Sequence, residues 1–348
     1  MKKIKSYAAA SSDSLLKPFD ITRRDCSDYD VYINIEYCGV CHSDIHMARN
    51  EWGGSTIYPI VPGHEIIGVV NKVGSKVKKF KIGDDVGVGV YVDSCGQCYN
   101  CKNDLDHYCE KGIVLTYNSY EYGTKTITYG GYSKAIVVNQ DYVVKIPNGM
   151  HKEKSAPLLC AGITTYSPLK YFKIGSNHKV GIAGLGGLGH MGLKFAVSFG
   201  ANVTVFSTSE SKREESLSLG AHSFVNVKNK EECKEALNSC HYILDTVSSN
   251  RNMNELFSLL RTDGVIMTVG LPTEPHKISG FDLIDKRKGI AGSAIGSISE
   301  TQEMINYCHK NDIYPEVEVI PIEKINLAFD NTIAGKVRYR YVIDMSSL

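Results

Sequence analysis

Apolar and polar positions alternate in two different ways along this chain of 348 residues. From about residue 178 onward, apolar runs at 178–183, 203–206, 223–227, 242–247, 264–270 and 289–294 predict strands. The segments between them predict helices that run to about residue 199 and over 212–219, 230–237 and 253–260. Strands and helices that alternate in this way are typical of a doubly wound parallel α/β sheet.

Residues 1 to about 150 have a different pattern. Short alternating runs, such as 31–37 and 68–73, are punctuated by glycine and proline and show little helical periodicity, which favours an antiparallel β domain. A helix over 300–310 and a strand over 338–344 are expected to return to that domain. The chain is too long for one comfortable core, so we expect two domains. The antiparallel domain would comprise 1–155 and 296–348, and the parallel domain 156–295.

The composition and charge exclude several classes of protein. Apolar residues make up 43% and charged residues 22% of the chain, as in an ordinary globular protein. Since 39 basic and 38 acidic side chains leave a net charge of +1, the chain has no broad field to attract nucleic acid or anionic membranes. Neither a secretory signal nor a transmembrane run of apolar residues is visible. We therefore expect a cytoplasmic protein with no nucleic-acid or membrane partner.

The strongest local signal is a group of four cysteines among the eleven in the chain. Cysteines of a large intracellular protein stay reduced and, where they cluster, often bind metal. Two-residue gaps let the backbone curl around a tetrahedral Zn²⁺, so this closed four-sulfur group predicts a structural zinc site. An iron–sulfur cluster is the main alternative. The last gap between its cysteines usually holds three residues, whereas seven lie between the last two cysteines here. Unliganded thiols are a further alternative. The four are Cys95, Cys98, Cys101 and Cys109.

A second set of candidate ligands is scattered through the sequence as Cys41, His64, Glu65 and Cys160. Each alone is better interpreted as a buried cysteine or a hydrogen-bonded histidine. Together, two thiolates, one imidazole and a carboxylate would form a zinc site with room for an outside ligand. Such a metal would act as a Lewis acid on an alcohol or aldehyde oxygen. Zinc has no redox chemistry of its own, so a cofactor would have to carry the hydride.

A dinucleotide turn follows the first strand of the parallel domain. The turn has the pattern G-x-G-x-x-G, with a strand before it and a helix after it, and this context indicates pyrophosphate binding at the helix N-terminus. Its residues are Gly184, Gly186, Gly187, Leu188 and Gly189.

The end of the next strand indicates which dinucleotide binds. Ser207, Thr208 and Ser209 stand where an NAD enzyme places an acidic residue. With Lys212 and Arg213 they could form an anion pocket for a 2′-phosphate, so we expect NADP. The serines could instead cap the following helix through a capping box at residues 211–214, and both roles can hold together.

The sequence resembles zinc-containing members of the medium-chain dehydrogenase/reductase superfamily over essentially its whole length. The resemblance rests on GHEIIG at 63–68, with Gly74 and Val77 at matching intervals, and on the four-cysteine segment. CGVCHSD at 38–44, APLLCAG at 156–162 and GLGGLGH at 184–190 are most similar to the cinnamyl-alcohol dehydrogenase branch. This implies a GroES-like catalytic zinc domain with a Rossmann domain, two zinc ions per chain, NADP, and a homodimer.

The resemblance also implies roles for individual residues. Cys41, His64 and Cys160 would hold the catalytic zinc, with Glu65 as a fourth ligand when substrate is absent. Asp44 would orient His64. Ser43 would hydrogen-bond the substrate oxygen and pass its proton through the cofactor ribose to His46, although His46 could simply be a surface histidine. The weaker assignments place His42 near the pyrophosphate, Thr164 near the nicotinamide and Arg340 near phosphate.

The substrate pocket departs from the plant members of that branch. Trp52 occupies an aromatic pocket position, but Leu115 stands where a second tryptophan is expected, so the aromatic cage is incomplete. Trp52 could alternatively serve packing alone. An apolar pocket discriminates weakly by size. We therefore expect a broad range of primary alcohols and aldehydes, including cinnamyl and benzyl ones.

Three other functions compete with this prediction. A zinc polyol dehydrogenase of the same fold would be expected to lack the Cys160 thiolate and often to keep an acidic ribose contact. A zinc-free quinone reductase would share the dinucleotide turn but neither group of metal ligands. A zinc-ribbon nucleic-acid binder would leave the turn without a role, and the near-neutral charge argues against it.

Overall fold

The chain folds into two units in the computed structural model, which describes residues 2–272 and 274–348. Unit 1 comprises the chain up to Ile163 together with Gly296–Leu348, and unit 2 is Thr164–Ile295. Unit 1 is therefore assembled from two segments that are far apart in the sequence.

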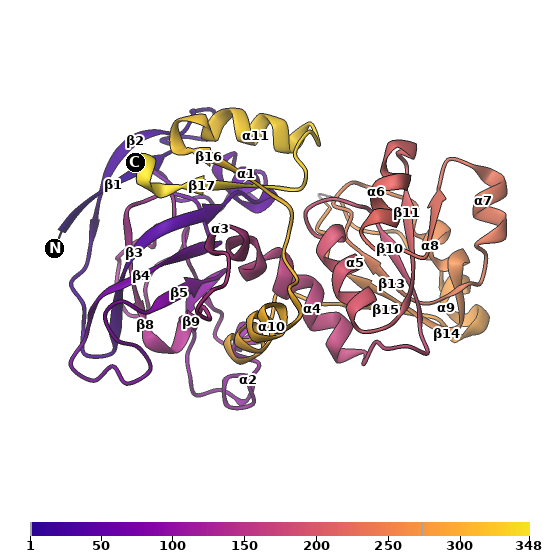
Figure 1. The fold of residues 1–348 in the computed structure, drawn as a ribbon, viewed down its shortest axis with the longest axis horizontal. Coiled ribbons are helices and arrows are strands. Elements are labelled where there is room, and N and C mark those ends of the chain that lie inside the picture. The colour runs from indigo at the N-terminus through magenta and orange to yellow at the C-terminus, as the bar shows by residue number, and fades with distance from the viewer. Residues whose placement is uncertain (1, 273) are drawn as a thin grey trace. The chain divides into compact units, whose positions relative to one another are not determined.

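Unit 1 is built on a mostly antiparallel seven-stranded sheet (Figure 1). Its order is β16 (Val317–Pro321), β17 (Arg340–Asp344), β3 (Asp30–Gly39), β4 (Ile66–Val73), β5 (Asp85–Val88) and β9 (Val144–Lys145), and β8 (Ala135–Asn139) also pairs with β3. Only the β16–β17 pair in this sheet is parallel. Apolar side chains such as Val31, Ile33 and Ile66 are fully buried, so the alternating runs in the sequence form a core-facing sheet.

Smaller elements complete unit 1. Two hairpins pair β1 (Lys2–Ala8) with β2 (Lys17–Arg23) and β6 (Tyr91–Asp93) with β7 (Val114–Leu115). The helices are α1 (His42–Ala48), α2 (Tyr99–Lys102), α3 (Lys152–Ser155), α10 (Ile298–Asn311) and α11 (Ile325–Ile333). A 3₁₀ turn over Ala156–Leu159 leads to α4 (Ala161–Tyr171), whose later residues belong to unit 2.

Unit 2 is a six-stranded parallel sheet with helices packed against it (Figure 1). The order is β12 (Ser223–Asn226), β11 (Asn202–Ser207), β10 (Lys179–Ala183), β13 (Cys240–Asp245), β14 (Leu260–Thr268) and β15 (Gly289–Gly292). The helices are α5 (Gly189–Ser198), α6 (Arg213–Ser218), α7 (Lys230–Glu235), α8 (Met253–Leu259) and α9 (Gly280–Ile284). This order confirms the predicted doubly wound fold. The strand order reverses between β10 and β13, the place where such sheets bind ligands.

Several helices do not follow from the sequence pattern. α4 has buried residues on all sides, and a helix buried all round has no amphipathic stripe to detect. α1 has seven residues, too few for a clear period.

The capping box suggested at residues 211–214 is wrong: the N-cap of α6 is Lys212, and no side chain makes a capping hydrogen bond there. Ser211 Oγ lies 2.9 Å from Ser209 Oγ instead.

Among the described residues, no helix has both the length and the apolar character needed to cross a bilayer.

Candidate functional site

Four buried side chains gather in unit 1, from segments that are distant in the sequence. Cys41 is the N-cap of α1, His64 and Glu65 precede β4, and Cys160 follows the 3₁₀ turn. Their potential ligand atoms all lie within 4.8 Å of one another, and Cys41 Sγ and Cys160 Sγ are 3.9 Å apart. Thiolates, imidazole and carboxylate are the ligands that zinc takes in catalytic sites. The residues predicted to hold a catalytic zinc therefore fit the metal.

The electrostatics of the two thiols also suit a metal site. A hydrogen bond with Cys160 lowers the pKa of Cys41 well below its usual value, and Arg340 and His64 act in the same direction. The same pairing, together with burial, raises the pKa of Cys160. A thiolate at Cys41 is thus favoured within the protein, and thiolates are the form that binds metal.

Glu65 is fully buried beside these ligands. Within the described part of the chain neither of its oxygens accepts a hydrogen bond, and its ion partner is Arg340, with Nη2 3.3 Å from Oε1. Burial raises the pKa of Glu65 to about 8, although Arg340 opposes the shift. The space is made by Gly39, where an added Cβ would lie 1.8 Å from Glu65 Oε2. Arg340, predicted near phosphate, lies next to Glu65 and is itself buried.

Asp44 lies where it can orient the histidine ligand. The distance from its Oδ1 to His64 Nδ1 is 3.0 Å, and the same carboxylate accepts hydrogen bonds from the backbone N–H groups of Cys41 and Gly63. Burial lowers the pKa of His64, but Asp44 outweighs it and raises that pKa well above the usual value. With Nδ1–H donating to Asp44, Nε2 is the nitrogen available to a metal.

The predicted relay residues lie on α1. Ser43 Oγ is 3.6 Å from Cys41 Sγ. His46 has two partners: its Nδ1 is 2.5 Å from Glu51 Oε2, and its ring stacks on Trp52 with centroids 5.1 Å apart. The His42 ring lies 6.3 Å from His46. The sequence prediction missed Glu51, because it lies in the turn after α1, where helical spacing rules do not apply.

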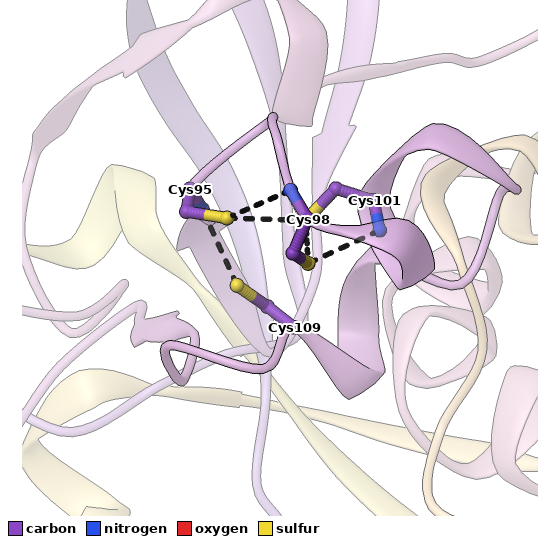
Figure 2. A group of neighbouring side chains, drawn as sticks. All are labelled: Cys95, Cys98, Cys101 and Cys109. Carbon is purple, nitrogen blue, oxygen red and sulfur yellow. Dashed lines mark hydrogen bonds between the residues drawn. The ribbon is translucent and has the colours of Figure 1, made fainter.

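The four cysteines of the predicted structural site converge on one loop around α2, as Figure 2 shows. Their sulfur atoms all lie within 4.8 Å of one another. Backbone N–H groups point at the sulfurs, for example from Cys98 to Cys95 Sγ at 3.4 Å and from Cys101 to Cys98 Sγ at 3.5 Å. Such bonds lower the pKa of Cys95 and Cys98. Four sulfurs held in this way match a closed tetrahedral zinc site.

The dinucleotide turn of unit 2 joins β10 to α5. Gly184 has φ +88°, and an added Cβ at Gly189 would lie 2.0 Å from the Gly184 carbonyl oxygen, so both positions require glycine. At Gly186 an added Cβ would meet nothing within 4 Å. Gly187 and Leu188 complete the turn, and α5 begins without a side-chain cap. The His190 N–H already bonds Gly186 O at 3.0 Å, so an anion at this helix end would have to bond the N–H groups of the turn that precede it.

The residues predicted to hold the 2′-phosphate lie at the end of β11 and just after it. Ser207 ends the strand, and Thr208 and Ser209 follow it. Lys212 Nζ donates to the carbonyl oxygen of Leu185 in the dinucleotide turn at 2.5 Å.

Arg213, offered by the sequence as a second cation for phosphate, is already paired. It bonds Glu210 and Glu232 and lies over the Phe224 ring. Lys212 is therefore the stronger candidate cation for a 2′-phosphate.

Known proteins match both units. The family model described as alcohol dehydrogenase GroES-like domain matches residues 27–148, and the one described as zinc-binding dehydrogenase matches residues 187–310. A probable mannitol dehydrogenase of Medicago sativa is 49% identical, covering 98% of this chain and 94% of its own length. A cinnamyl alcohol dehydrogenase structure from Sorghum bicolor has a TM-score of 0.96 at 40% identity, covering 99% of this chain and 98% of that one. CAD from Helicobacter pylori complexed with NADP(H) has a TM-score of 0.93 at 42% identity, with the same coverage.

Proposed function

Because the chain belongs to the zinc-containing medium-chain dehydrogenase/reductase superfamily, in its cinnamyl-alcohol dehydrogenase-like branch, we propose that it is an NADP-dependent alcohol dehydrogenase. It transfers a hydride between NADP(H) and a broad range of primary alcohols or aldehydes, including cinnamyl and benzyl ones. The observation that carries the proposal is the buried group of Cys41, His64, Glu65 and Cys160. The enzyme would hold two zinc ions per chain, a catalytic one at this group and a structural one at the four cysteines.

The residues around the catalytic group have distinct tasks. When bound, zinc would polarise the reacting oxygen and NADP(H) would exchange the hydride. Asp44 fixes the ring of His64 at 3.0 Å, and Ser43, next to Cys41, supplies a hydroxyl that can hydrogen-bond the reacting oxygen. His46, held by Glu51 at 2.5 Å, is the group that can take up or release the proton.

Cofactor binding is assigned first to unit 2. The turn at 184–189 and the hydroxyls of Ser207, Thr208 and Ser209 would hold the pyrophosphate and the 2′-phosphate, with Lys212 as the cation. The family resemblance adds His42 and Arg340 as contacts to phosphate and Thr164 as a contact near the nicotinamide. The catalytic domain would be 1–155 and 296–348, and the dinucleotide-binding domain 156–295.

The experiment that tests the function is a rate comparison on purified, zinc-loaded protein. NADPH oxidation with cinnamaldehyde should be much faster than NADH oxidation, and metal analysis should give two zinc ions per chain. Comparable rates with the two cofactors would contradict the NADP assignment, and a zinc-free active protein would favour the quinone reductase alternative. A panel with benzaldehyde, aliphatic aldehydes and mannitol would separate aldehyde reduction from polyol oxidation, which the name of the Medicago relative makes worth testing.

We further propose a cytoplasmic homodimer with small-molecule substrates as its partners. None of the eleven cysteines forms a disulfide, as expected in a reducing compartment. β15 is an edge strand, and the preceding segment exposes Phe281 by 85% and Ile284 by 80%. Exposed apolar side chains beside a sheet edge favour association of two copies. Sedimentation of the wild type and of a Phe281→Glu/Ile284→Glu variant should show a dimer and a monomer, respectively.

A further inference from the structure

Asp44 is the centre of a buried hydrogen-bond network. Its Oδ1 accepts from the Gly63 backbone N–H and from His64 Nδ1, both at 3.0 Å. Its Oδ2 accepts from the Cys41 backbone N–H at 2.9 Å and from the Tyr132 hydroxyl at 3.2 Å. Asp44 is fully buried, and a buried carboxylate is tolerated only when its lone pairs are satisfied. The network therefore depends on donors from several parts of unit 1.

Two tyrosines from outside the predicted site surround this network. Tyr132 is fully buried and Tyr117 is 5% exposed. The Tyr117 ring lies 5.9 Å from the His64 ring, tilted by 32°. Burial and the neighbouring Asp44 carboxylate raise the pKa of both phenols well above the usual value. The Tyr132 hydroxyl donates to Asp44 Oδ2, so it takes a direct part in the network.

The backbone holds Tyr132 against the histidine ligand. Residues 130–132 pair with 61–63, through hydrogen bonds such as Gly131 N–H to Gly63 O at 2.8 Å and Tyr132 N–H to Pro62 O at 3.0 Å. Gly63 has φ +104°, and an added Cβ there would lie 2.8 Å from Tyr132 Cδ1. The Tyr132 ring thus packs directly on the residue that precedes His64.

We propose that Tyr132 and Tyr117 are positioning residues for the zinc ligand His64, Tyr132 through Asp44 and Tyr117 through the contact of its ring with the imidazole. The inference rests on the proposed function, in which Cys41, His64 and Cys160 hold the catalytic zinc. The Tyr132 hydroxyl and the Cys41 N–H occupy Asp44 Oδ2, while His64 Nδ1 and the Gly63 N–H bond Oδ1. The Tyr117 ring, 5.9 Å from the imidazole, limits its tilt. Together they keep Nε2 directed at the sulfur pair, and groups that orient a metal ligand in this way raise metal affinity.

The test removes the Tyr132 hydroxyl and the Tyr117 ring in turn from zinc-loaded protein. Tyr132→Phe and Tyr117→Leu are compared with Tyr58→Phe, whose hydroxyl donates to Ala48 O at 2.8 Å, outside the network. Chelator competition measures the zinc dissociation constant, and a Cys160→Ala variant supplies the baseline of the four-cysteine site. Tyr132→Phe should bind the catalytic zinc about tenfold more weakly. Its Co²⁺-substituted form should show shifted visible absorption bands, and the control should match the wild type.

A double-mutant cycle separates positioning from general stability. If Tyr132 acts through Asp44, Tyr132→Phe should cause no further loss of zinc affinity in an Asp44→Asn background. Full additivity of the two losses would overturn the inference, as would unchanged affinity and Co²⁺ spectra in both single variants. A wild-type chain that binds no more zinc than Cys160→Ala would contradict the proposed function itself, and the inference with it.

Discussion

The preference for NADPH over NADH should depend on one cation, Lys212. Its ammonium group donates to Leu185 O in the dinucleotide turn at 2.5 Å, whereas Arg213 is held by Glu210 and Glu232. Lys212→Met keeps the apolar stem but removes a charged hydrogen-bond donor, and such a bond contributes about 1.5–3 kcal/mol. The ratio of kcat/KM for NADPH to that for NADH should therefore fall roughly 10- to 150-fold.

Steady-state kinetics with cinnamaldehyde measure this ratio, with Arg213→Met as the matched control. The control should lower thermal stability, because Glu210 and Glu232 lose their partner, and leave the cofactor ratio unchanged. If Arg213→Met lowered the ratio as far as Lys212→Met, the assignment of the 2′-phosphate to Lys212 would be wrong. An unchanged ratio in Lys212→Met would refute it directly.

Three further variants test the metal sites and the acid stability of unit 1. Cys160→Ala should abolish turnover and remove one zinc per chain, as read by metal analysis, with a circular dichroism spectrum like that of the wild type. Cys98→Ala should instead lower the melting temperature by about 5–10 °C, since a structural zinc contributes folding energy; an unchanged melting temperature would argue against that site. Burial tends to raise the pKa of Asp30, but hydrogen bonds from Arg24 and Ser27 outweigh it and bring the pKa below its usual value. Asp30 therefore stabilises the fold at pH values above the usual carboxyl pKa and loses the contribution as the pH falls through its own lowered pKa. The melting-temperature gap between wild type and Asp30→Asn should close in acid, and a constant gap would exclude this linkage.

The parts of the site that the sequence revealed are those with fixed spacing or a fixed backbone requirement. The four-cysteine loop is local, so its gaps alone indicated a metal, and the glycines of the dinucleotide turn are required by a positive φ at Gly184 and a close approach at Gly189. Cys41, His64 and Cys160 lie far apart in the chain. Their residue types suggested a shared zinc site and the resemblance to a known family supported it, but no spacing in the sequence shows that they meet.

The supporting side chains could not be predicted in the same way. Tyr117 and Tyr132 belong to irregular segments, and an isolated tyrosine carries no spacing signal that connects it to Asp44. Whether Arg213 was free depended on Glu232, a partner from another helix. The short helix α1 gave no detectable period, although it carries Ser43, Asp44 and His46. Local patterns thus identified the ligands, while tertiary packing determined what surrounds them.

Because unit 1 is assembled from two segments, its last strands are translated only after all of unit 2. β17 pairs with β3, yet all of unit 2 is translated between them. A nascent chain can complete the parallel sheet before residues 37–39 of β3 have their β17 partner, although β8 already pairs with the first half of that edge. An unpaired strand edge favours aggregation. A nonsense mutation just before Arg340 would therefore spare the Rossmann fold and leave the remainder as a target for chaperones and proteases.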